Sequence, residues 1–420
     1  MDKRTFIKNS ALLGAGSLIS FPAISKIVDA VSHLPAEAVA SDDDFWTRIR
    51  GNYKLKDDYI NLENGYYCIQ PQEILEKYIE HIREVNLQGA HYMRTVRFEN
   101  KRKAVEKLCE ITGTTPEDTI CTRNTTESLD LVISGMDWKP GDEAVMAEQD
   151  YGAMLDMFKQ VAKRYGVVNK IISVPLHPQN DEEIVELYAN AITPKTKLLM
   201  VCQMINITGQ ILPVRKICDM AHRKNVPVMV DGAHAFAHIK FTIPELDCDY
   251  YGCSLHKWLS VPLGAGMLYM KKERIGKGWP IFADSGKKDD DILRFNHTGT
   301  HPVATDLAIS DAIEFYMKIG AERKEERLRY LQNYWTGKVR NMPHVILNTP
   351  AGQARSCGIA NVGINGIKPA DLAETLLKKY KIYTVAIDGA GVHGCRITPN
   401  VFTTTAELDA LVNAITDMRG

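Results

Sequence analysis

The chain has 420 residues, 45% of them hydrophobic and 25% charged, which is the composition of a soluble globular protein with two or three structural units. The formal net charge is −1 and the basic residues form no stripe, so a nucleic-acid partner has no electrostatic support. The nine cysteines are scattered without a CxxC pair, and no metal-ligand spacing such as HExxH occurs, so we expect neither a disulfide framework nor a bound metal.

The first 40 residues have the features of an export signal. Basic residues precede an apolar stretch at 11–23 that is short for a membrane span, and the sequence AVA at 38–40 has the small-x-small pattern of a cleavage site. The segment DKRTFIK resembles the twin-arginine signal, with Lys3 where the first arginine normally stands. We therefore expect residues 1–40 to lie outside the fold and the protein to be periplasmic or otherwise exported. The alternative is an N-terminal arm on a cytoplasmic protein.

Residues 41–75 are expected to form an N-terminal segment that joins the smaller domain formed by the last part of the chain. The sequence YINLENGYYCIQP at 59–71 is typical of a strand and turn. Helical periodicity follows at 73–86 and again at 97–113, where glycine and then proline end the second helix.

A large domain is expected over 76–295. Within it, short apolar runs alternate with amphipathic helices; the runs are DTICT, EAVMAE, KLLMVCQM, VPVMVDGAH, DYYGCSL and AGMLYM. This alternation predicts an α/β fold with a mostly parallel sheet between helices. Such sheets bind ligands at the carboxyl ends of their strands.

The last part of the chain, 296–420, has a different pattern. Residues 303–339 read as long helices, and strand-like pieces with one helix at 369–381 predict a smaller α+β domain.

Polar side chains follow five of the predicted strands. They are Thr125 and Thr126, then Tyr151, then Asn206, then Asp231 and His234, and finally Ser254, His256 and Lys257. Each has an ordinary interpretation by itself, such as a helix cap or a turn residue. Together they offer a helix start for a phosphate, an aromatic ring, a carboxylate and a lysine. This set matches pyridoxal phosphate, whose aldehyde needs an amine and whose pyridine nitrogen needs an anion.

The pattern VDGAHA at 230–235 followed by CSLHKW at 253–258 resembles the class V aminotransferases, which are fold type I pyridoxal-phosphate enzymes. The resemblance covers most of the chain after residue 60. It implies a large domain with a seven-stranded type of sheet and a smaller α+β domain.

The resemblance also implies that the cofactor is pyridoxal 5'-phosphate, bound as a Schiff base to Lys257. It implies further cofactor contacts for eight residues: Asp231 at the pyridine nitrogen, His234 near the ring, Tyr151 stacked on it, Asn206 at the ring hydroxyl, and Thr125, Thr126, Ser254 and His256 at the phosphate.

Four more residues are implied at the substrate or at a subunit boundary. Arg396 in CRITPNVFTT resembles the arginine that clamps a substrate carboxylate, although alone it would read as a strand-end surface arginine. Asn64 and Tyr67 belong to a segment that resembles one closing over the site and would touch substrate. Thr300 in HTGTHP resembles the residue that reaches the phosphate of the neighbouring subunit, which implies a homodimer with shared sites.

Three reaction classes remain open for a small-molecule amino-acid or peptide substrate. Epimerisation and transamination both begin with loss of the α-proton, with Lys257 as the base, and Tyr151 favours the isopenicillin N epimerase-like branch. Cysteine desulfurases and C–S lyases of this family often use a mobile cysteine upstream of the arginine. The stretch before Arg396 has none there, and Cys395 is expected to face away from the arginine. A non-catalytic binding protein is the least favoured reading, because Asp231 and Lys257 are both present.

Overall fold

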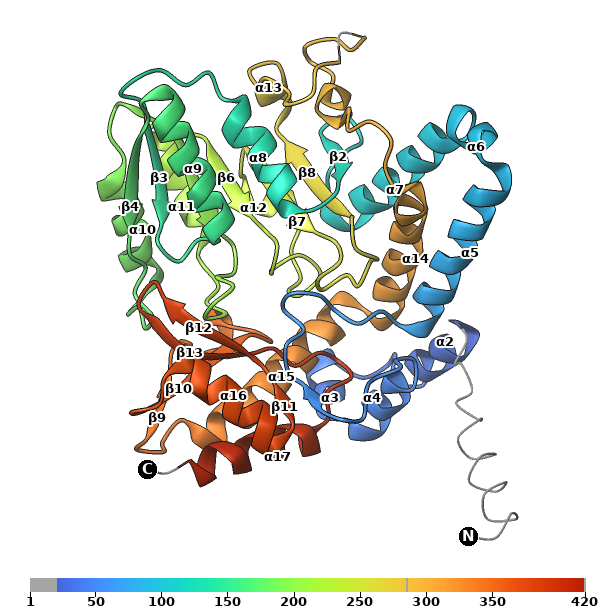
Figure 1. Cartoon of the computed structure of the whole chain (residues 1–420), viewed down its shortest axis with the longest axis vertical. Coiled ribbons are helices and arrows are strands. Elements are labelled where there is room, and N and C mark those ends of the chain that lie inside the picture. Colours follow the sequence, from blue (N-terminus) through green and yellow to red (C-terminus); the bar gives the residue numbers. More distant parts are fainter. Residues whose placement is uncertain (1–20, 285, 419–420) are drawn as a thin grey trace.

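A seven-stranded sheet and a smaller four-stranded sheet organise the computed structural model, which describes residues 21–284 and 286–418 (Figure 1). The large sheet contains β2 (Thr119–Thr122), β3 (Glu143–Ala147), β4 (Val168–Ile172), β5 (Thr196–Cys202), β6 (Val228–Asp231), β7 (Tyr250–Ser254) and β8 (Gly266–Met270). Their order is β2-β8-β7-β6-β5-β3-β4, and all neighbours are parallel except the two pairs that include β8. The predicted mostly parallel sheet is confirmed.

Helices surround both sheets. Those before the small domain are α2 (Phe21–Asp29), α3 (Ala36–Ala40), α4 (Asp43–Arg50), α5 (Gln72–Gln88), α6 (Ala90–Arg94), α7 (Arg97–Thr112), α8 (Thr125–Gly135), α9 (Gly152–Tyr165), α10 (Asp181–Ala191), α11 (Val214–Arg223), α12 (Ile243–Leu246), α13 (Lys272–Ile275) and the 3-10 helix η1 (Ile292–Asn296). The remaining ones are α14 (Val303–Ile319), α15 (Ala321–Val339), η2 (Gln353–Arg355), α16 (Pro369–Tyr380) and α17 (Thr405–Asp417). The helical run at 303–339 divides at Gly320, whose φ of 93° breaks the helix.

Both faces of the large sheet are buried, which explains the continuous apolar runs in the sequence. Along β5, Leu198 and Met200 pack in one core cluster, whereas Leu199 and Val201 pack in another. Because successive side chains of a strand point to opposite faces, the two clusters lie on the two sides of the sheet. The edge strand β4 is only half-buried, and its mixed pattern had given no clear strand signal.

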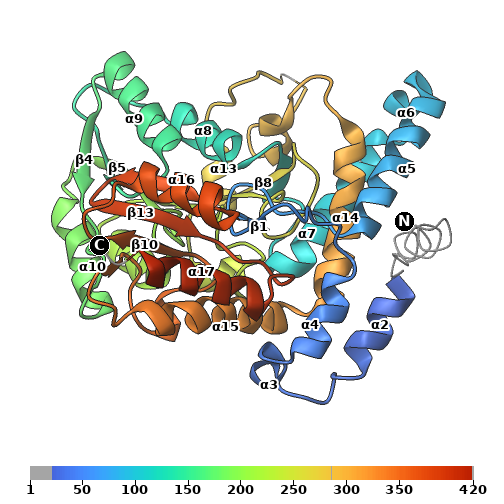
Figure 2. The ribbon, with the colours of Figure 1, turned by 60° about the horizontal axis from the view of Figure 1, so that its bottom comes forward.

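The small domain is built on an antiparallel sheet in the order β12-β13-β10-β9. Its strands are β9 (Val345–Leu347), β10 (Ala360–Ile364), β12 (Val385–Gly389) and β13 (Val392–Ile397), and Figure 2 shows α16 and α17 beside it. A separate parallel pair joins β1 (Ile60–Asn61) to β11 (Ile382–Tyr383). The N-terminal segment thus reaches the small domain, as expected for 41–75.

Residues 21–40 are part of the folded body, although the sequence analysis placed the start of the fold at Ser41. Helix α2 lies against α14 and α4, and α3 lies against α15 (Figure 2). Ile24 and Val39 are fully buried in the core that covers one face of the large sheet. An apolar residue in a leader sequence and one in a packed helix look alike locally, so only the tertiary contacts distinguish them. No helix in the described residues is long and apolar enough to cross a bilayer.

Two side chains from other elements donate hydrogen bonds to backbone carbonyls of the AVA sequence at 38–40. Trp46 Nε1 donates to the carbonyl of Val39 at 2.8 Å, and Arg327 Nη1 donates to the carbonyl of Ala40 at 3.0 Å. Arg327 itself is 1% exposed and also lies over the ring of Trp46. Val39 and Ala40 are therefore buried in the fold, whereas Ala38 is exposed.

We expect deletion of residues 1–40 to destabilise the protein, whereas deletion of 1–20 leaves the contacts of α2 and α3 in place. The longer deletion removes buried Ile24 and Val39 and takes one of its carbonyl acceptors from the buried guanidinium of Arg327. We expect a loss of about 3 kcal/mol or more in the free energy of unfolding. Urea denaturation of the two truncated proteins measures the difference. Equal stability would show that α2 and α3 contribute nothing to the fold.

Candidate active site

The β2–α8 turn and the end of β7 are tied together at the start of α8. The backbone N–H of Thr125 donates to Ser254 Oγ at 2.9 Å, and the two hydroxyls lie 2.7 Å apart. Asn124 caps α8 by accepting from the N–H of Glu127. A side chain at Gly266 would lie 2.6 Å from the Asn124 backbone, so only glycine lets β8 approach this turn. The result is a helix N-terminus flanked by two hydroxyls, which suits an anionic group.

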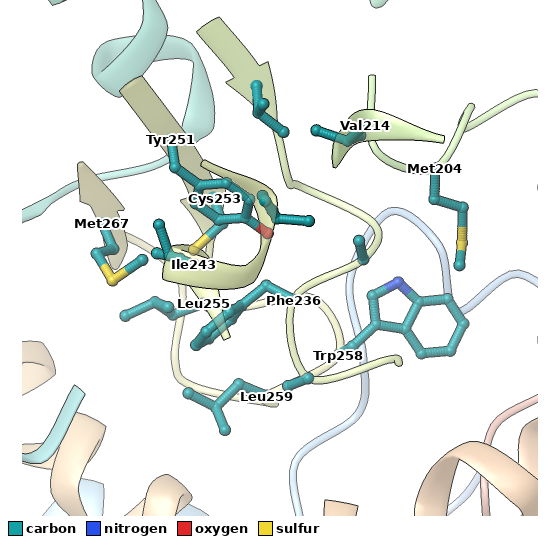
Figure 3. Packing of buried hydrophobic residues seen from close by; sticks show 14 of the residues in the cluster. Met204, Val214, Phe236, Ile243, Tyr251, Cys253, Leu255, Trp258, Leu259 and Met267 are labelled. Atoms are coloured by element: carbon teal, nitrogen blue, oxygen red, sulfur yellow. The ribbon is translucent and has the colours of Figure 1, made fainter. Parts of the chain in front are cut away.

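Lys257 follows β7 in a turn whose neighbours are anchored in the core. Leu255, Trp258 and Leu259 are buried and belong to the cluster shown in Figure 3. The Nζ of buried Lys324 donates to the carbonyl of Trp258. These contacts fix the backbone on both sides of Lys257. The side chain that carries the amine therefore starts from a rigid backbone.

The amine of Lys257 meets His234 at the end of β6. The Lys257 Nζ and His234 Nε2 atoms are 2.9 Å apart. Burial lowers the pKa of Lys257 to about 8, with Asp231 opposing the shift and Arg396 adding to it. Burial, reinforced by the Lys257 charge, also places the pKa of His234 well below its usual value. Near neutral pH the imidazole is therefore uncharged and can accept a hydrogen bond from the lysine.

Asp231 supplies a carboxylate at the same place. It is 3% exposed, and its Oδ1 accepts from the N–H of Ala233 at 2.9 Å. Burial raises the pKa of Asp231, while the Ala233 N–H and Lys257 act in the opposite direction. A second buried carboxyl, Asp150, has its pKa raised to about 7, first by burial and also by the charge of Asp231. The ionised form of Asp231 is thus costly unless a cationic partner lies beside it.

Arg396, on β13 of the small domain, reaches the large domain. Its Nη1 donates to the carbonyl of Asn206 at 3.2 Å, in the loop that follows β5. Its other edge pairs with Glu63, with Nη2 to Oε1 at 2.5 Å and Nε to Oε2 at 3.2 Å. The charge of Arg396 acts on the pKa of both Lys257 and His234, so the arginine lies near the lysine.

Comparisons with known proteins agree on one family. The family model for "Aminotransferase class-V" matches residues 69–410. The chain belongs to the class V aminotransferase family. Isopenicillin N epimerase from Streptomyces clavuligerus is 24% identical over 89% of this chain and 98% of its own length. A probable cysteine desulfurase from Halalkalibacterium halodurans is 28% identical over 76% of this chain and 80% of its own length. A solved structure of a C-DES mutant with glycine covalently linked to the PLP cofactor has a TM-score of 0.76 at 21% identity, covering 86% of this chain and 97% of that one.

The class V chain is accordingly a fold type I enzyme that uses pyridoxal phosphate. The residues present fit this cofactor. The Nδ1 atoms of both His234 and His256 are buried and have no hydrogen-bond partner among the described residues, which leaves polar groups at the site for a ligand. Lys257 would hold the aldehyde, Asp231 would hold the ring nitrogen, and the start of α8 would hold the phosphate. The unpaired atoms and the depressed lysine pKa are what a site built for this group needs.

Two more predicted cofactor contacts lie at the same strand ends of the class V fold. Thr126 is half-buried in the first turn of α8, beside Thr125. Tyr151 is the residue before α9, and 43% of it is exposed, so its ring is free to cover a bound group. Their contacts to the cofactor stay predictions.

Three predicted residues remain, two in the segment that contacts Arg396 and one in a surface groove. Asn64 is fully buried and its amide donates to the carbonyl of Thr398 at 2.8 Å, which ties its segment to the small domain. Its contact to a substrate stays a prediction. Tyr67 is half-buried. Thr300 is exposed in a groove of about 910 Å³ between α7 and the 284–300 loop. Glu63 was not predicted, because its only signal in the sequence is an acidic residue beside Asn64.

The cysteines of the class V enzyme offer no exposed thiol. All nine are unpaired and buried. Cys395 is fully buried in the core of the small domain, where its Sγ lies 3.6 Å from the carbonyl of Pro369. It points away from the neighbouring Arg396, as the sequence analysis expected.

We expect Lys257 in the cofactor-free class V enzyme to react with pyridoxal phosphate at a rate that rises with pH through about 8 and is constant above it. Only the neutral amine attacks an aldehyde, and the neutral fraction grows as the pH passes the depressed pKa. Stopped-flow absorbance over a pH series measures the midpoint. A midpoint near the ordinary lysine value of about 10.4 would show that burial does not lower this pKa.

Proposed function

We propose that the enzyme acts at the α-carbon of an amino acid or small peptide and begins by removing the α-proton, as an epimerase or aminotransferase does. The observation that carries this proposal is the contact of 2.9 Å between Lys257 Nζ and His234 Nε2 beside buried Asp231. When bound, pyridoxal phosphate supplies an electron-withdrawing ring that stabilises negative charge on the α-carbon.

The protein's own residues have distinct parts in this proposal. Lys257, with a pKa of about 8, takes and returns a proton near neutral pH. His234 stays uncharged and holds the Lys257 amine by a hydrogen bond. Asp231 provides the negative charge that keeps the ring nitrogen protonated. The hydroxyls of Thr125 and Ser254 orient the phosphate end.

Cysteine desulfuration or another C–S lyase reaction is the second candidate. Several curated relatives are named cysteine desulfurases, among them one from Escherichia coli at 26% identity over 86% of this chain. The burial of every thiol disfavours a mechanism that needs a mobile cysteine. The second candidate is therefore a C–S lyase reaction that does not use a mobile cysteine.

A panel of amino acids and dipeptides in deuterated water separates these reactions. Incorporation of deuterium at the α-carbon with inversion indicates epimerisation, and keto-acid formation indicates transamination. Release of sulfide or ammonia indicates a lyase. If the protein loaded with pyridoxal phosphate exchanges no α-proton in any substrate, the proposed function is wrong.

We further propose a homodimer in which Thr300 reaches the neighbouring active site. The groove that contains Thr300 is also lined by Phe98, which is 66% exposed, and by Leu293, which is 43% exposed. A large exposed apolar patch of this kind is typical of an interface. Light scattering of the purified protein would give the mass of the assembly, and a monomer with full activity would contradict shared sites.

Export through the twin-arginine route is proposed from residues 1–40. This route carries folded, cofactor-loaded proteins, which suits a pyridoxal-phosphate enzyme. The burial of Val39 and Ala40 favours a leader that is not cut after Ala40 once the chain has folded. A reporter fused to residues 1–40 tests export, and retention in the cytoplasm would contradict it.

A further inference from the structure

The guanidinium of Arg396 is already paired with a carboxylate of this chain. Glu63 meets it side-on, with Nη2 to Oε1 at 2.5 Å and Nε to Oε2 at 3.2 Å. The side chains are 8% and 5% exposed, so little water competes with the pair. The two residues are 333 positions apart in the sequence.

Glu63 is held in this position by its own segment. Its Oε1 also accepts from the N–H of Tyr66 at 3.0 Å, and its own N–H donates to Asn61 Oδ1 at 3.0 Å. The segment lies flat on the arginine, because a side chain at Gly65 would be 3.3 Å from Arg396 Cζ. A backbone bridge from Glu63 to Thr398 fixes the segment against the small domain. The pairing is therefore built into the segment around Glu63.

This pairing changes what Arg396 can offer to a ligand. The Nε–H and one N–H of Nη2 donate hydrogen bonds to Glu63, and one N–H of Nη1 donates to the carbonyl of Asn206. Of the five N–H groups of a guanidinium, two remain. A neutral carbonyl can accept from them without cost. A carboxylate must bring a second negative charge next to Glu63, where burial leaves like charges poorly screened.

We propose that Glu63 is a specificity-determining residue, a built-in competitor that occupies the edge of Arg396 where a substrate carboxylate would otherwise bind. The site then discriminates against a free carboxylate next to the reacting carbon. It favours substrates in which that carboxyl group is amide-linked, as in a peptide or an amino-acid amide. The inference rests on the proposed function, in which Arg396 faces the substrate.

The test compares an acid with its amide in wild type and in Glu63→Gln. Propionate and propionamide are titrated into cofactor-free protein by calorimetry, and L-alanine and L-alaninamide are titrated into cofactor-loaded protein by absorbance. We expect wild type to bind the acid no more tightly than the amide. In Glu63→Gln we expect the acid to bind about tenfold more tightly or better, with the amide changed by less than about twofold. The calorimetric arm needs no bound cofactor, so it gives a result even if the proposed reaction is wrong.

Two further variants keep the test decisive. Asp58→Asn removes a carboxylate from the same segment, where Asp58 makes an exposed ion pair with Lys56, and should leave both affinities unchanged. Glu63→Asp keeps the charge on a shorter side chain, and should show a smaller gain for the acid if Glu63→Gln does not fold. The proposal is overturned if wild type already binds propionate about tenfold more tightly than propionamide. It is also overturned if Glu63→Gln weakens propionate binding, because Glu63 would then position Arg396 for the acid.

Discussion

Lys257→Ala is expected to abolish the visible absorbance band of the lysine-bound cofactor and to lower turnover by about 10²–10⁴-fold or more. The Lys257 amine contacts His234 and its pKa is influenced by the charge of Asp231, so its removal takes away both the predicted covalent link to pyridoxal phosphate and the proposed base. Absorbance spectra and turnover of the purified variant, loaded with the cofactor, measure the two losses.

Lys324→Met is the matched control for this variant. Lys324 is also buried, and burial lowers its pKa to about 8 as well. Its amine donates to the carbonyl of Trp258, whereas the Lys257 amine contacts His234. We therefore expect the Lys324 variant to keep the absorbance band. If Lys257→Ala kept the band and Lys324→Met lost it, the assignment of the reactive lysine would be wrong.

Asp231→Asn is expected to lower turnover by about 10²–10³-fold while the cofactor stays bound to Lys257. Asparagine keeps the shape of the side chain and can still accept from the N–H of Ala233, but it has no charge to hold the ring nitrogen protonated. The absorbance band should therefore persist while α-proton exchange in deuterated water becomes slow.

Asp231→Asn is expected to stabilise the cofactor-free protein, although it lowers turnover. Burial raises the pKa of Asp231 in the folded state, so folding favours the protonated form and the ionised carboxyl costs stability as the pH rises through that pKa. Asparagine removes this cost, and we expect thermal unfolding of the cofactor-free variant at neutral pH to occur at a higher temperature than in wild type. Loss of both activity and stability would instead indicate that Asp231 has a structural role.

The sequence predicted the mostly parallel sheet and proposed most of the cofactor site. Parallel strands buried on both faces require continuous apolar runs, and six such runs became β2, β3, β5, β6, β7 and β8. Since the carboxyl ends of parallel strands share one edge, the order of the residues after them was enough to place Asp231 near Lys257. The half-exposed edge strand β4 lacked this signal.

Only the tertiary structure decided how distant segments meet at and around this site. The helices at 21–40 look like part of a leader until Val39 is seen to pack under α15 and to accept from Trp46. The pairing of Glu63 with Arg396 joins residues 333 positions apart. Such contacts have no local pattern, because their energy comes from burial and charge between segments that only the fold brings together. The sequence thus predicted which groups lie at the proposed cofactor site, and only the fold showed that Arg396 is already paired with Glu63.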